Sequence, residues 1–340
     1  MNQAQKKLNI SLVTQNAEKY LPFCLNSLFN QSFKDYTLSV IDNGSNDRTV
    51  AVIKENYSQI KVVEYHDNIG FAKAHNKAIS WTKSEYICIL NQDVILEKEY
   101  LKNLIDFMDD NREVGSVAGK ILSWDFNNNL KLNSIDSKGL KIFKNHRVIE
   151  IDQGQDDKVE NTNLEVFGVS GAVPIYRLEV LKKIKLENNL KADEYFDELF
   201  FSYKEDVDLA YRLRLAGFKS FYIPTSIAYH DRTVKGENDL SDKTTIKSRK
   251  NKDQMVKIYS YKNHLQVLYK NEFFSNLIKY FFHIFWYELK KLIYILFNEP
   301  STLRGLKLYF KQLKQIKKKR NYIKKNIRKI NAKELAKWYN

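Results

Sequence analysis

The chain contains few of the residues that mark disulfide-rich, collagen-like or low-complexity proteins. Its 340 residues include two cysteines, four prolines and 11 glycines. Cys24 and Cys88 cannot build a disulfide framework, and no Cys/His spacing indicates a zinc site. Because both lie among apolar residues, we expect them to be small buried side chains. With 43% hydrophobic and 29% charged residues, the sequence is that of a globular protein and excludes global disorder.

A long uninterrupted apolar segment is also missing. The first eight residues are polar and offer no core for a secretory signal. The segment Phe273–Phe297 is rich in aromatic residues, but three lysines and a glutamate interrupt it. A spanning helix needs about 20 predominantly apolar residues, so a helix at a membrane surface or packed on the protein body fits better. We therefore expect a reducing, cytoplasmic location.

Excess charge is scarce outside the last 40 residues. Residues 301–340 hold 14 Lys and Arg against one acidic residue and so carry 13 of the 15 net positive charges. Residues 1–300 are nearly neutral. This distribution predicts a catalytic or binding body with a basic attachment segment.

Three interpretations of the basic segment remain open. As an amphipathic helix it would bind an anionic membrane surface, where each Lys or Arg adds about 1 kcal/mol. Alternatively, its apolar stripe packs on the body or on a second copy, as in a homodimer, and the lysines are solvated. A nucleic-acid arm is disfavoured because no recognition motif accompanies it, so we expect no nucleic-acid partner.

The first 120 residues alternate short apolar runs with amphipathic stretches, which predicts a mostly parallel sheet with helical crossovers. The expected strands are Leu8–Thr14, Tyr36–Asp42, Ile60–Tyr65, Tyr86–Leu90 and Val114–Ile121. The expected helices are Glu18–Asn30, Thr49–Asn56, Phe71–Trp81 and Lys98–Asp110. In such sheets, ligands bind at the carboxyl ends of the strands.

The alternation stops after Trp124. The polar region from Asp125 to Asn163 predicts loops or short strands over one edge of a site. A second structured block runs from Leu164 to His230, and its expected elements are the helices Leu178–Ile184 and Asp206–Ala216 and the strands Lys219–Ile223 and Ser226–His230. The charged segment Asp231–Asp253 predicts a mobile loop.

Acidic side chains occupy positions where such a sheet would place a ligand site. Asp42 ends the second strand, Asp93 follows the fourth, and Asp206 and Asp208 open a later helix. Each alone would also fit a helix cap or turn. Together they indicate a metal–diphosphate site, since Mg²⁺ takes one or two carboxylates plus substrate phosphate oxygens.

These residues lie in motifs that resemble, in order, those of family 2 glycosyltransferases, in particular bacterial rhamnosyltransferase-like members. The resemblance covers roughly residues 8–232. Its motifs are Asp42–Asp47, Asn68–Ala72, Asn91–Asp93, Ser170–Ala172, Phe196–Glu198 and Glu205–Leu209, followed by Pro224 and His230.

The resemblance implies a GT-A fold and an inverting, metal-dependent transfer from a nucleotide-sugar donor. It implies that Thr14, Asn16 and Asp42 hold the base and ribose. Lys73 and Asn76 would lie near the diphosphate or neighbouring groups.

The resemblance also implies that Asp93 and His230 bind a divalent metal, Mg²⁺ or Mn²⁺. Asn91 is a metal-motif neighbour, because it stands where the family usually has the first Asp of Asp-x-Asp. Gln15 stands where an aromatic residue is common.

Catalysis would fall to Asp206 as general base, with Glu205 and Asp208 in support. A carboxylate at a helix N-terminus favours its ionised form, which suits a base near neutral pH.

We accordingly expect an α/β chain with a Rossmann-like GT-A domain at 1–235 and a helical, basic extension at 236–340 that associates with a membrane or a second subunit. Within the domain, about 1–120 would bind the nucleotide sugar and about 164–235 the acceptor. The expected reaction moves a sugar, plausibly rhamnose from dTDP-rhamnose, to a hydroxyl of a surface polysaccharide or lipid-linked oligosaccharide. The alternatives are a UDP- or GDP-sugar donor, or a catalytically silent scaffold of a glycan-assembly complex.

Overall fold

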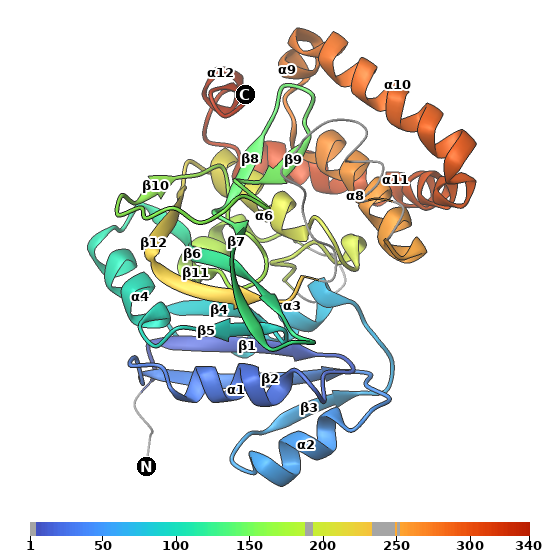
Figure 1. Ribbon diagram of the computed structural model, residues 1–340. Helices are drawn as coiled ribbons and strands as arrows, with labels where there is room; N and C mark the ends of the chain where they lie inside the picture. Colours follow the sequence, from blue (N-terminus) through green and yellow to red (C-terminus); the bar gives the residue numbers. More distant parts are fainter. Residues whose placement is uncertain (1–4, 188–192, 233–248, 250–251) are drawn as a thin grey trace.

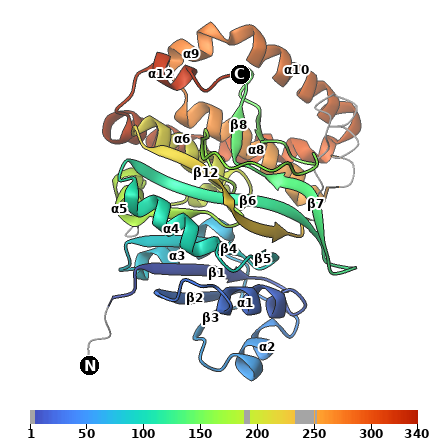
Figure 2. The ribbon, with the colours of Figure 1, turned by 60° about the vertical axis from the view of Figure 1, so that its left-hand side comes forward.

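A computed structural model describes residues 5–187, 193–232, 249 and 252–340. The fold is mixed α/β around a mostly parallel central sheet, with helices on both faces and a C-terminal helical region on one side (Figures 1 and 2). The strands are β1 Leu8–Thr14, β2 Tyr36–Asn43, β3 Val62–Tyr65, β4 Tyr86–Asn91, β5 Val94–Leu96, β6 Val114–Asp125, β7 Leu130–Ser137, β8 Leu140–Ile142, β9 Val148–Glu150, β10 Leu164–Glu165, β11 Ile175–Arg177 and β12 Lys219–His230.

The helices of the first 230 residues match the predicted ones closely. They are α1 Leu21–Phe29, α2 Thr49–Asn56, α3 Phe71–Trp81, α4 Tyr100–Asp110, α5 Leu178–Ile184, the short η1 Glu198–Phe200 and α6 Glu205–Leu215. After them come α8 Gln254–Asn271, α9 Phe274–Lys279, α10 Phe281–Asn298, η2 Pro300–Leu303, α11 Arg304–Tyr322, η3 Ile323–Ile327 and α12 Ala332–Ala336.

The main sheet runs in the order β10-β12-β6-β11-β4-β1-β2-β3, with β5 paired to β12 and β7 to β6. The strands β3, β2, β1 and β4 are parallel neighbours, and β11 is an antiparallel strand between β4 and β6. The register pairs Thr14 with Asp42 and Val13 with Asn91. The carboxyl ends of three strands therefore meet at one edge, as the alternation predicts.

Two predicted strands are one in the structure. Strand β12 continues from Lys219 to His230 past Pro224, with a register shift against β6 between Ile223 and Ile227. Proline has no N–H to give to a ladder, so it is tolerated at such an irregularity. The continuous strand carries His230 to the same edge as Asp93, since His230 pairs with Val94 of β5.

The polar region after Trp124 contains three short strands joined by turns and loops. Strand β7 is eight residues long and returns antiparallel on β6, and β8 and β9 form a separate two-stranded sheet. Asn-rich residues at 127–129 form the turn between β6 and β7. The strand ends Asp136 and Glu150 lie buried or nearly so, which the polar composition of the segment concealed.

The C-terminal helices are packed on the body. Val267 of α8, Ile323 and Ile327 of η3 and Leu335 of α12 belong to the same buried apolar cluster as α5 and α6. The other large cluster joins the sheet to α1 and α4. The predicted boundary near residue 235 and most of the predicted loop 231–253 lie outside the described residues.

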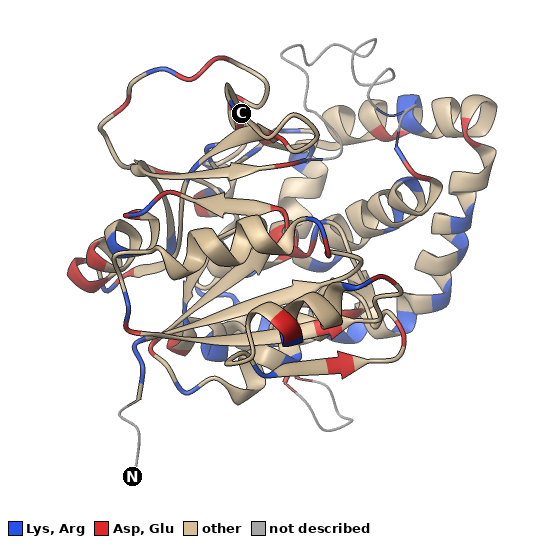
Figure 3. Cartoon of the chain, turned by 60° about the horizontal axis from the view of Figure 1, so that its bottom comes forward, with Lys and Arg blue, Asp and Glu red and all other residues tan. Residues whose placement is uncertain are grey.

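The aromatic segment that was predicted as one helix is divided at Tyr280 into α9 and α10. Helix α10 lies at the outer edge of the molecule (Figures 1 and 2). Among the described residues, no helix combines the length and apolar character needed to cross a membrane. Lys and Arg recur along the C-terminal helices (Figure 3).

Candidate active site

The ends of β1 and β2 hold a pair of buried polar side chains. Thr14 Oγ1 donates a hydrogen bond to Asp42 Oδ1 (3.1 Å), and Asp42 Oδ2 accepts one from the Ser45 N–H (3.0 Å). Thr14 and Asp42 are 0% and 3% exposed. The exposed Asn16 has φ of 49°, and its side-chain oxygen accepts from the Asn46 N–H (2.8 Å). The three predicted residues at these strand ends are thus brought together.

Amide side chains connect this pair to the end of β4. Gln15 and Gln92 exchange two hydrogen bonds, from the Gln15 N–H to Gln92 Oε1 (2.7 Å) and from Gln92 Nε2 to the Gln15 carbonyl (3.0 Å). Asn68 Nδ2 donates to Gln15 Oε1, and Asn43 Nδ2 donates to Asn68 Oδ1. Gln15, which departs from the expected aromatic residue, therefore joins three motifs.

The two predicted residues of α3 lie on different faces of that helix. Lys73 is exposed, in the first turn after Gly70. Asn76 is 4% exposed; its amide donates to the Phe196 carbonyl (2.8 Å), and its oxygen accepts from the Tyr195 and Phe196 N–H groups. The Asn76 side chain thus fixes the 195–196 segment, because its face of the helix points into the body, and its predicted place near the diphosphate stays a prediction.

Asp93 and His230 meet at the predicted metal position. His230 Nε2 lies 3.4 Å from Asp93 Oδ1, and His230 Nδ1 lies 2.9 Å from Asp136 Oδ2. Burial by itself would lower the pKa of His230, but Asp93 and Asp136 raise it to about 10. Asn91 is half-buried, and its N–H donates to the Ala172 carbonyl (2.9 Å).

A charged cluster beside His230 was missed at the sequence level. Arg232 pairs with Asp136 (2.9 Å) and with Glu150 (3.1 Å), and its charge also acts on Asp206. Asp136 and Glu150 end strands in the region whose strand pairing the composition did not reveal. Only Arg232, two residues after His230, had a position that could have drawn attention.

Asp206 lies at the start of α6, against the small-residue turn. Its carboxylate accepts from the Gly171 N–H (3.2 Å) and from the Val207 N–H (2.7 Å). Burial raises the pKa of Asp206, while these N–H groups and Lys204 oppose the rise. Burial, together with the charge of Asp206, raises the pKa of Glu205 to about 8. The site thus holds two adjacent acids with raised pKa values.

Asp208 points away from Asp206, into the body. Its carboxylate contacts Lys270 (2.7 Å), Asn271 (2.7 Å) and Arg212 (3.0 Å). Asp208 and Lys270 are both fully buried. The predicted support of Asp208 for Asp206 is therefore indirect: it anchors α6 to α8.

With this geometry established, the comparisons with known proteins decide the family. Residues 10–184, more than half of the chain, match the model of Glycosyl transferase family 2. The chain belongs to glycosyl transferase family 2. Enzymes of this family transfer sugars, so the chain is a glycosyltransferase.

Similar family members differ in how much of their length this glycosyltransferase matches. It is 25% identical over 305 residues to an uncharacterized glycosyltransferase of Methanocaldococcus jannaschii, which covers 88% of this chain and 92% of that one. It is 24% identical over 200 residues to the poly(ribitol-phosphate) beta-N-acetylglucosaminyltransferase TarP of Staphylococcus aureus, covering 57% of this chain and 56% of TarP.

The chain also resembles a solved structure, that of GalNAc-T7 with UDP, GalNAc and Mn²⁺. The TM-score is 0.60 at 14% identity, over 98% of this chain and 59% of that one. This likeness shows the GT-A fold. The chain spans less than two thirds of the length of both TarP and GalNAc-T7.

The donor set at Asp93 and His230 fits a divalent metal. It offers one carboxylate and one imidazole to accompany substrate oxygens, and the imidazole becomes a ligand only when metal binding displaces the proton that Asp93 and Asp136 favour. No group of three or more His, Cys, Asp and Glu that could hold a metal occurs among the described residues. A metal at this glycosyltransferase site would therefore depend on ligand oxygens from the donor.

Proposed function

We propose that this glycosyltransferase moves a sugar from a nucleotide-sugar donor to an acceptor hydroxyl with inversion, using Asp206 as the general base. One observation carries the proposal: base and donor sites share one strand edge. The Asp206 carboxylate binds the Gly171 N–H, and the next residue, Ala172, accepts the N–H of Asn91 in the metal motif.

The roles follow from what each side chain can do. Inversion is a single displacement at the anomeric carbon, so a base must take the acceptor proton on the side opposite the leaving diphosphate. Asp206 would take this proton, and the N–H groups of Gly171 and Val207 hold its carboxylate in place. Asp93 and His230 would hold a divalent metal, which supplies charge stabilisation to the leaving diphosphate when bound.

The nucleotide would bind at the end of β1 and β2. Asp42 is fixed by Thr14 and Ser45, so its carboxylate is oriented before a ligand arrives. Thr14, Asn16 and Asp42 would contact the base and ribose. Lys73 is exposed in the first turn of α3 and would supply a positive charge toward the diphosphate side. Glu205 would keep water from the base, as a neutral acid at neutral pH.

The donor within this proposal is dTDP-rhamnose, with a surface polysaccharide or lipid-linked oligosaccharide as acceptor. A UDP-sugar is the second candidate. It is favoured by the similarity to TarP, named as a beta-N-acetylglucosaminyltransferase, and by the fold shared with GalNAc-T7, whose structure holds UDP and Mn²⁺. A GDP-sugar and a silent scaffold are the further alternatives.

A thermal-shift panel tests the donor site. We expect one nucleotide class to raise the unfolding midpoint only with Mn²⁺ or Mg²⁺ present, because a ligand that binds the folded state stabilises it. The metal-dependent part of the shift should vanish in Asp93→Ala. Absence of any shift with dTDP-, UDP- and GDP-sugars would contradict the donor site and favour the scaffold.

We further propose that residues 236–340 attach the catalytic domain, residues 1–235, to the inner face of a membrane. Helices α9 and α10 expose aromatic and aliphatic side chains, with Phe282 80% and Phe297 83% exposed. Helix α11 adds exposed lysines. The apolar set is Phe274, Ile278, Phe281, Phe282, Phe285, Trp286, Ile293, Leu296 and Phe297, and the lysines are Lys307, Lys311, Lys314, Lys317 and Lys318.

An anionic bilayer matches this surface because it accepts aromatic rings at its interface and attracts lysines. The test is sedimentation with vesicles of phosphatidylglycerol and phosphatidylcholine. Phe282→Ser with Phe297→Ser should weaken binding to anionic vesicles about tenfold. Trp81→Ser, which removes a half-exposed aromatic side chain on α3, is the matched control. The homodimer would be favoured if wild-type protein does not bind vesicles but forms a dimer that the double variant does not form.

A further inference from the structure

The residues directly before the proposed base form a strained turn. Phe201, Tyr203 and Lys204 have φ of 66°, 71° and 66°, a region that non-glycine residues rarely adopt. At Phe201, ψ is −68°, and the Ser202 N–H donates to the Phe200 carbonyl (2.8 Å), which closes a γ-turn with positive φ. Such conformations persist only where surrounding structure holds them, and they concentrate at functional sites.

A single buried amide on α8 holds this turn. Asn263 Nδ2 donates to the carbonyls of Phe200 (3.1 Å), Ser202 (2.8 Å) and Tyr203 (2.7 Å), and Asn263 is 0% exposed. The neighbouring Lys262 donates to the Leu199 carbonyl. Four carbonyls in and beside the turn, those of Leu199, Phe200, Ser202 and Tyr203, are therefore held by one short stretch of a helix that begins 39 residues after α6 ends.

The same turn touches the donor side of the site. The Phe201 carbonyl accepts from the Ala72 N–H (3.2 Å). A Cβ atom at Gly70, whose φ is +86°, would lie 2.6 Å from the Phe201 ring and 2.9 Å from its carbonyl oxygen. Phe201 also stacks on Tyr259 of α8 at 5.2 Å. The turn is thus wedged between the motif that ends at Ala72 and the start of α6.

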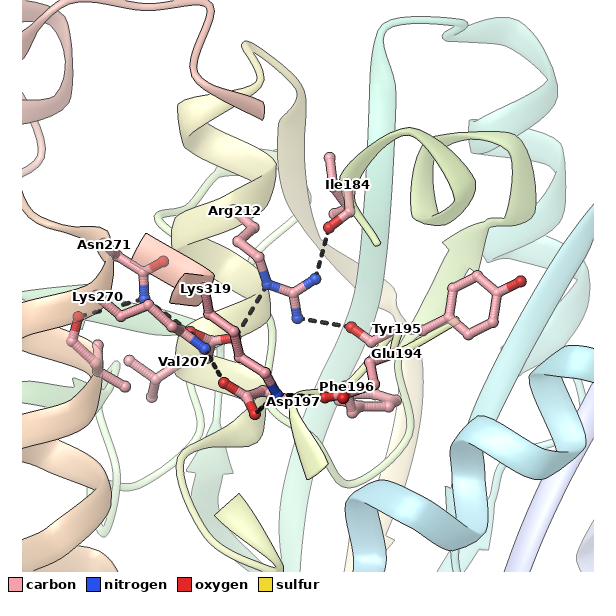
Figure 4. Close-up of polar contacts among 12 residues, drawn as sticks. Ile184, Glu194, Tyr195, Phe196, Asp197, Val207, Arg212, Lys270, Asn271 and Lys319 are labelled. Carbon is pink, nitrogen blue, oxygen red and sulfur yellow. Dashed lines mark hydrogen bonds and ion pairs between the residues drawn. The ribbon is translucent and has the colours of Figure 1, made fainter. Parts of the chain in front are cut away.

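Buried ion pairs anchor the chain on both sides of the turn (Figure 4). Lys270 of α8 pairs with Asp197 before the turn and with Asp208 after it. Lys319 of α11 also reaches Asp197 (2.6 Å), and the two lysine side chains converge on that carboxylate in Figure 4. Burial would raise the pKa of Asp197, but Lys270 and Lys319 hold it well below its usual range. The ends of the segment are therefore fixed, and Asn263 sets the path between them.

We propose that Asn263 is a positioning residue for sugar transfer. By binding three carbonyls of the turn, it sets the direction in which α6 starts and so the place of Asp206 relative to the donor motif at Gly70–Ala72. Asn263 acts through the turn and touches neither substrate. The proposal rests on the proposed role of Asp206 as base.

The test compares Asn263→Ala with Asn298→Ala. Asn298 is an exposed asparagine whose amide donates only to the Tyr294 carbonyl one turn earlier among the contacts of the described residues (3.2 Å). The readouts are release of nucleoside diphosphate from dTDP-rhamnose and UDP-N-acetylglucosamine, and the affinity for UDP or dTDP with Mn²⁺. We expect Asn263→Ala to lower kcat about 10- to 100-fold, because small misplacements of a catalytic group have effects of that size. KM and nucleotide affinity should stay within about twofold of wild type.

Two further variants keep the outcomes distinct. Asn263→Ser retains one hydrogen-bond donor and replaces the alanine variant if that variant does not fold. We expect its kcat to lie between those of wild type and Asn263→Ala. Asp206→Asn tests the proposed function itself. If Asp206→Asn loses turnover but Asn263→Ala keeps the wild-type kcat, the positioning role alone is overturned. The same holds if Asn263→Ala loses nucleotide affinity by as large a factor as it loses kcat. Full turnover in Asp206→Asn overturns both proposals.

Hydrogen exchange gives a readout that needs no donor. Amides of residues 199–208 should exchange faster in Asn263→Ala than in wild type or Asn298→Ala, because the turn loses its three shared hydrogen bonds. Unchanged exchange of that segment would overturn the proposal.

Discussion

The two sides of the site are held in different ways. At the nucleotide end of the donor side, Thr14 and Asp42 are cross-strand neighbours, and Ser45 in the turn directly after β2 also binds Asp42. On the base side, the chain around Asp206 is held by Asn263, Lys270 and Lys319 of the C-terminal helices. The donor side therefore depends on local strand ends, whereas the base side depends on residues far along the chain.

The largest effect that would sharpen this comparison is on turnover. Asp206→Asn should lower nucleoside diphosphate release by about 10²–10⁴-fold, because it removes the proton acceptor while keeping the side-chain shape. Nucleotide binding with Mn²⁺, measured by calorimetry, should be unchanged. A fall in nucleotide affinity as large as the fall in rate would mean that the two sides are not separate.

The next effect is on stability. Lys270→Met should reduce the free energy of unfolding by about 3–5 kcal/mol, because it removes one of the two cations that pair with each of the buried carboxylates Asp197 and Asp208. Urea unfolding measures the loss. Lys102→Met is the matched control: its pair with Asp106 on α4 is half-exposed, so removing it should cost about 0.5 kcal/mol or less. Equal losses of unfolding free energy in Lys270→Met and Lys102→Met would contradict the dependence of the base side on its buried ion pairs.

A smaller effect is expected on the donor side. Asp42→Asn should weaken UDP or dTDP binding about tenfold, since a hydrogen bond to a charged group is lost, while unfolding changes by about 1 kcal/mol. Titration calorimetry reports the first quantity and urea unfolding the second. Asp67→Asn changes a carboxylate that is 88% exposed and serves as control. If Asp42→Asn lost more unfolding free energy than Lys270→Met, the donor side and not the base side would contribute more to stability.

A further effect concerns the pH dependence of stability. The pKa of Glu205 is raised from 4.5 to about 8 in the folded chain, so the folded state keeps a proton that the unfolded state loses. The stability due to Glu205 is complete below pH 4.5 and declines as pH rises to about 8. The free energy of unfolding of Glu205→Gln should therefore rise relative to that of wild type across that interval, by at most about 1.4 kcal/mol per pH unit. Above the interval the difference should stay constant.

Thermal unfolding at several pH values between 4 and 9 checks this change. A Glu205→Gln difference that stays constant across the range would show that Glu205 ionises as it does in the unfolded chain. The variant Glu198→Gln, at a partly buried acid of η1, is measured alongside as the baseline.

The sequence predicted which residues lie at the strand ends of the sheet edge, because those signals are local. Asp42 and Asp93 each follow a buried strand, and the strand–helix alternation places such positions at one edge of the sheet. Asp206 was found through its motif. Belonging to glycosyl transferase family 2 confirmed what the order of the motifs indicated, whereas the rhamnose donor stays a prediction.

The rest depended on contacts that no short stretch encodes. Asn76 shares a helix with Lys73, and only the packing of α3 shows that its amide faces the 195–196 segment. Asp136 reaches His230 because β7 pairs with β6, in a region for which composition predicted loops or short strands but no pairing. Asn263 lies in an ordinary helical sequence, and the carbonyls that it binds are more than 55 residues earlier.

The pairing of Lys319 with Asp197 also has a consequence for synthesis. The two residues are 122 positions apart, so Asp197 leaves the ribosome long before its last partner is made. Until then Asp197 lacks one of the two lysines that stabilise its buried carboxylate, so the chain around α6 is only partly stabilised. The sheet edge of the donor side can form early from its own strands, but the segment that carries Asp206 completes its folding only once α11 has emerged. A ribosome that stalls before residue 319 would therefore hold a nascent chain with a formed nucleotide-binding edge and an unfinished base.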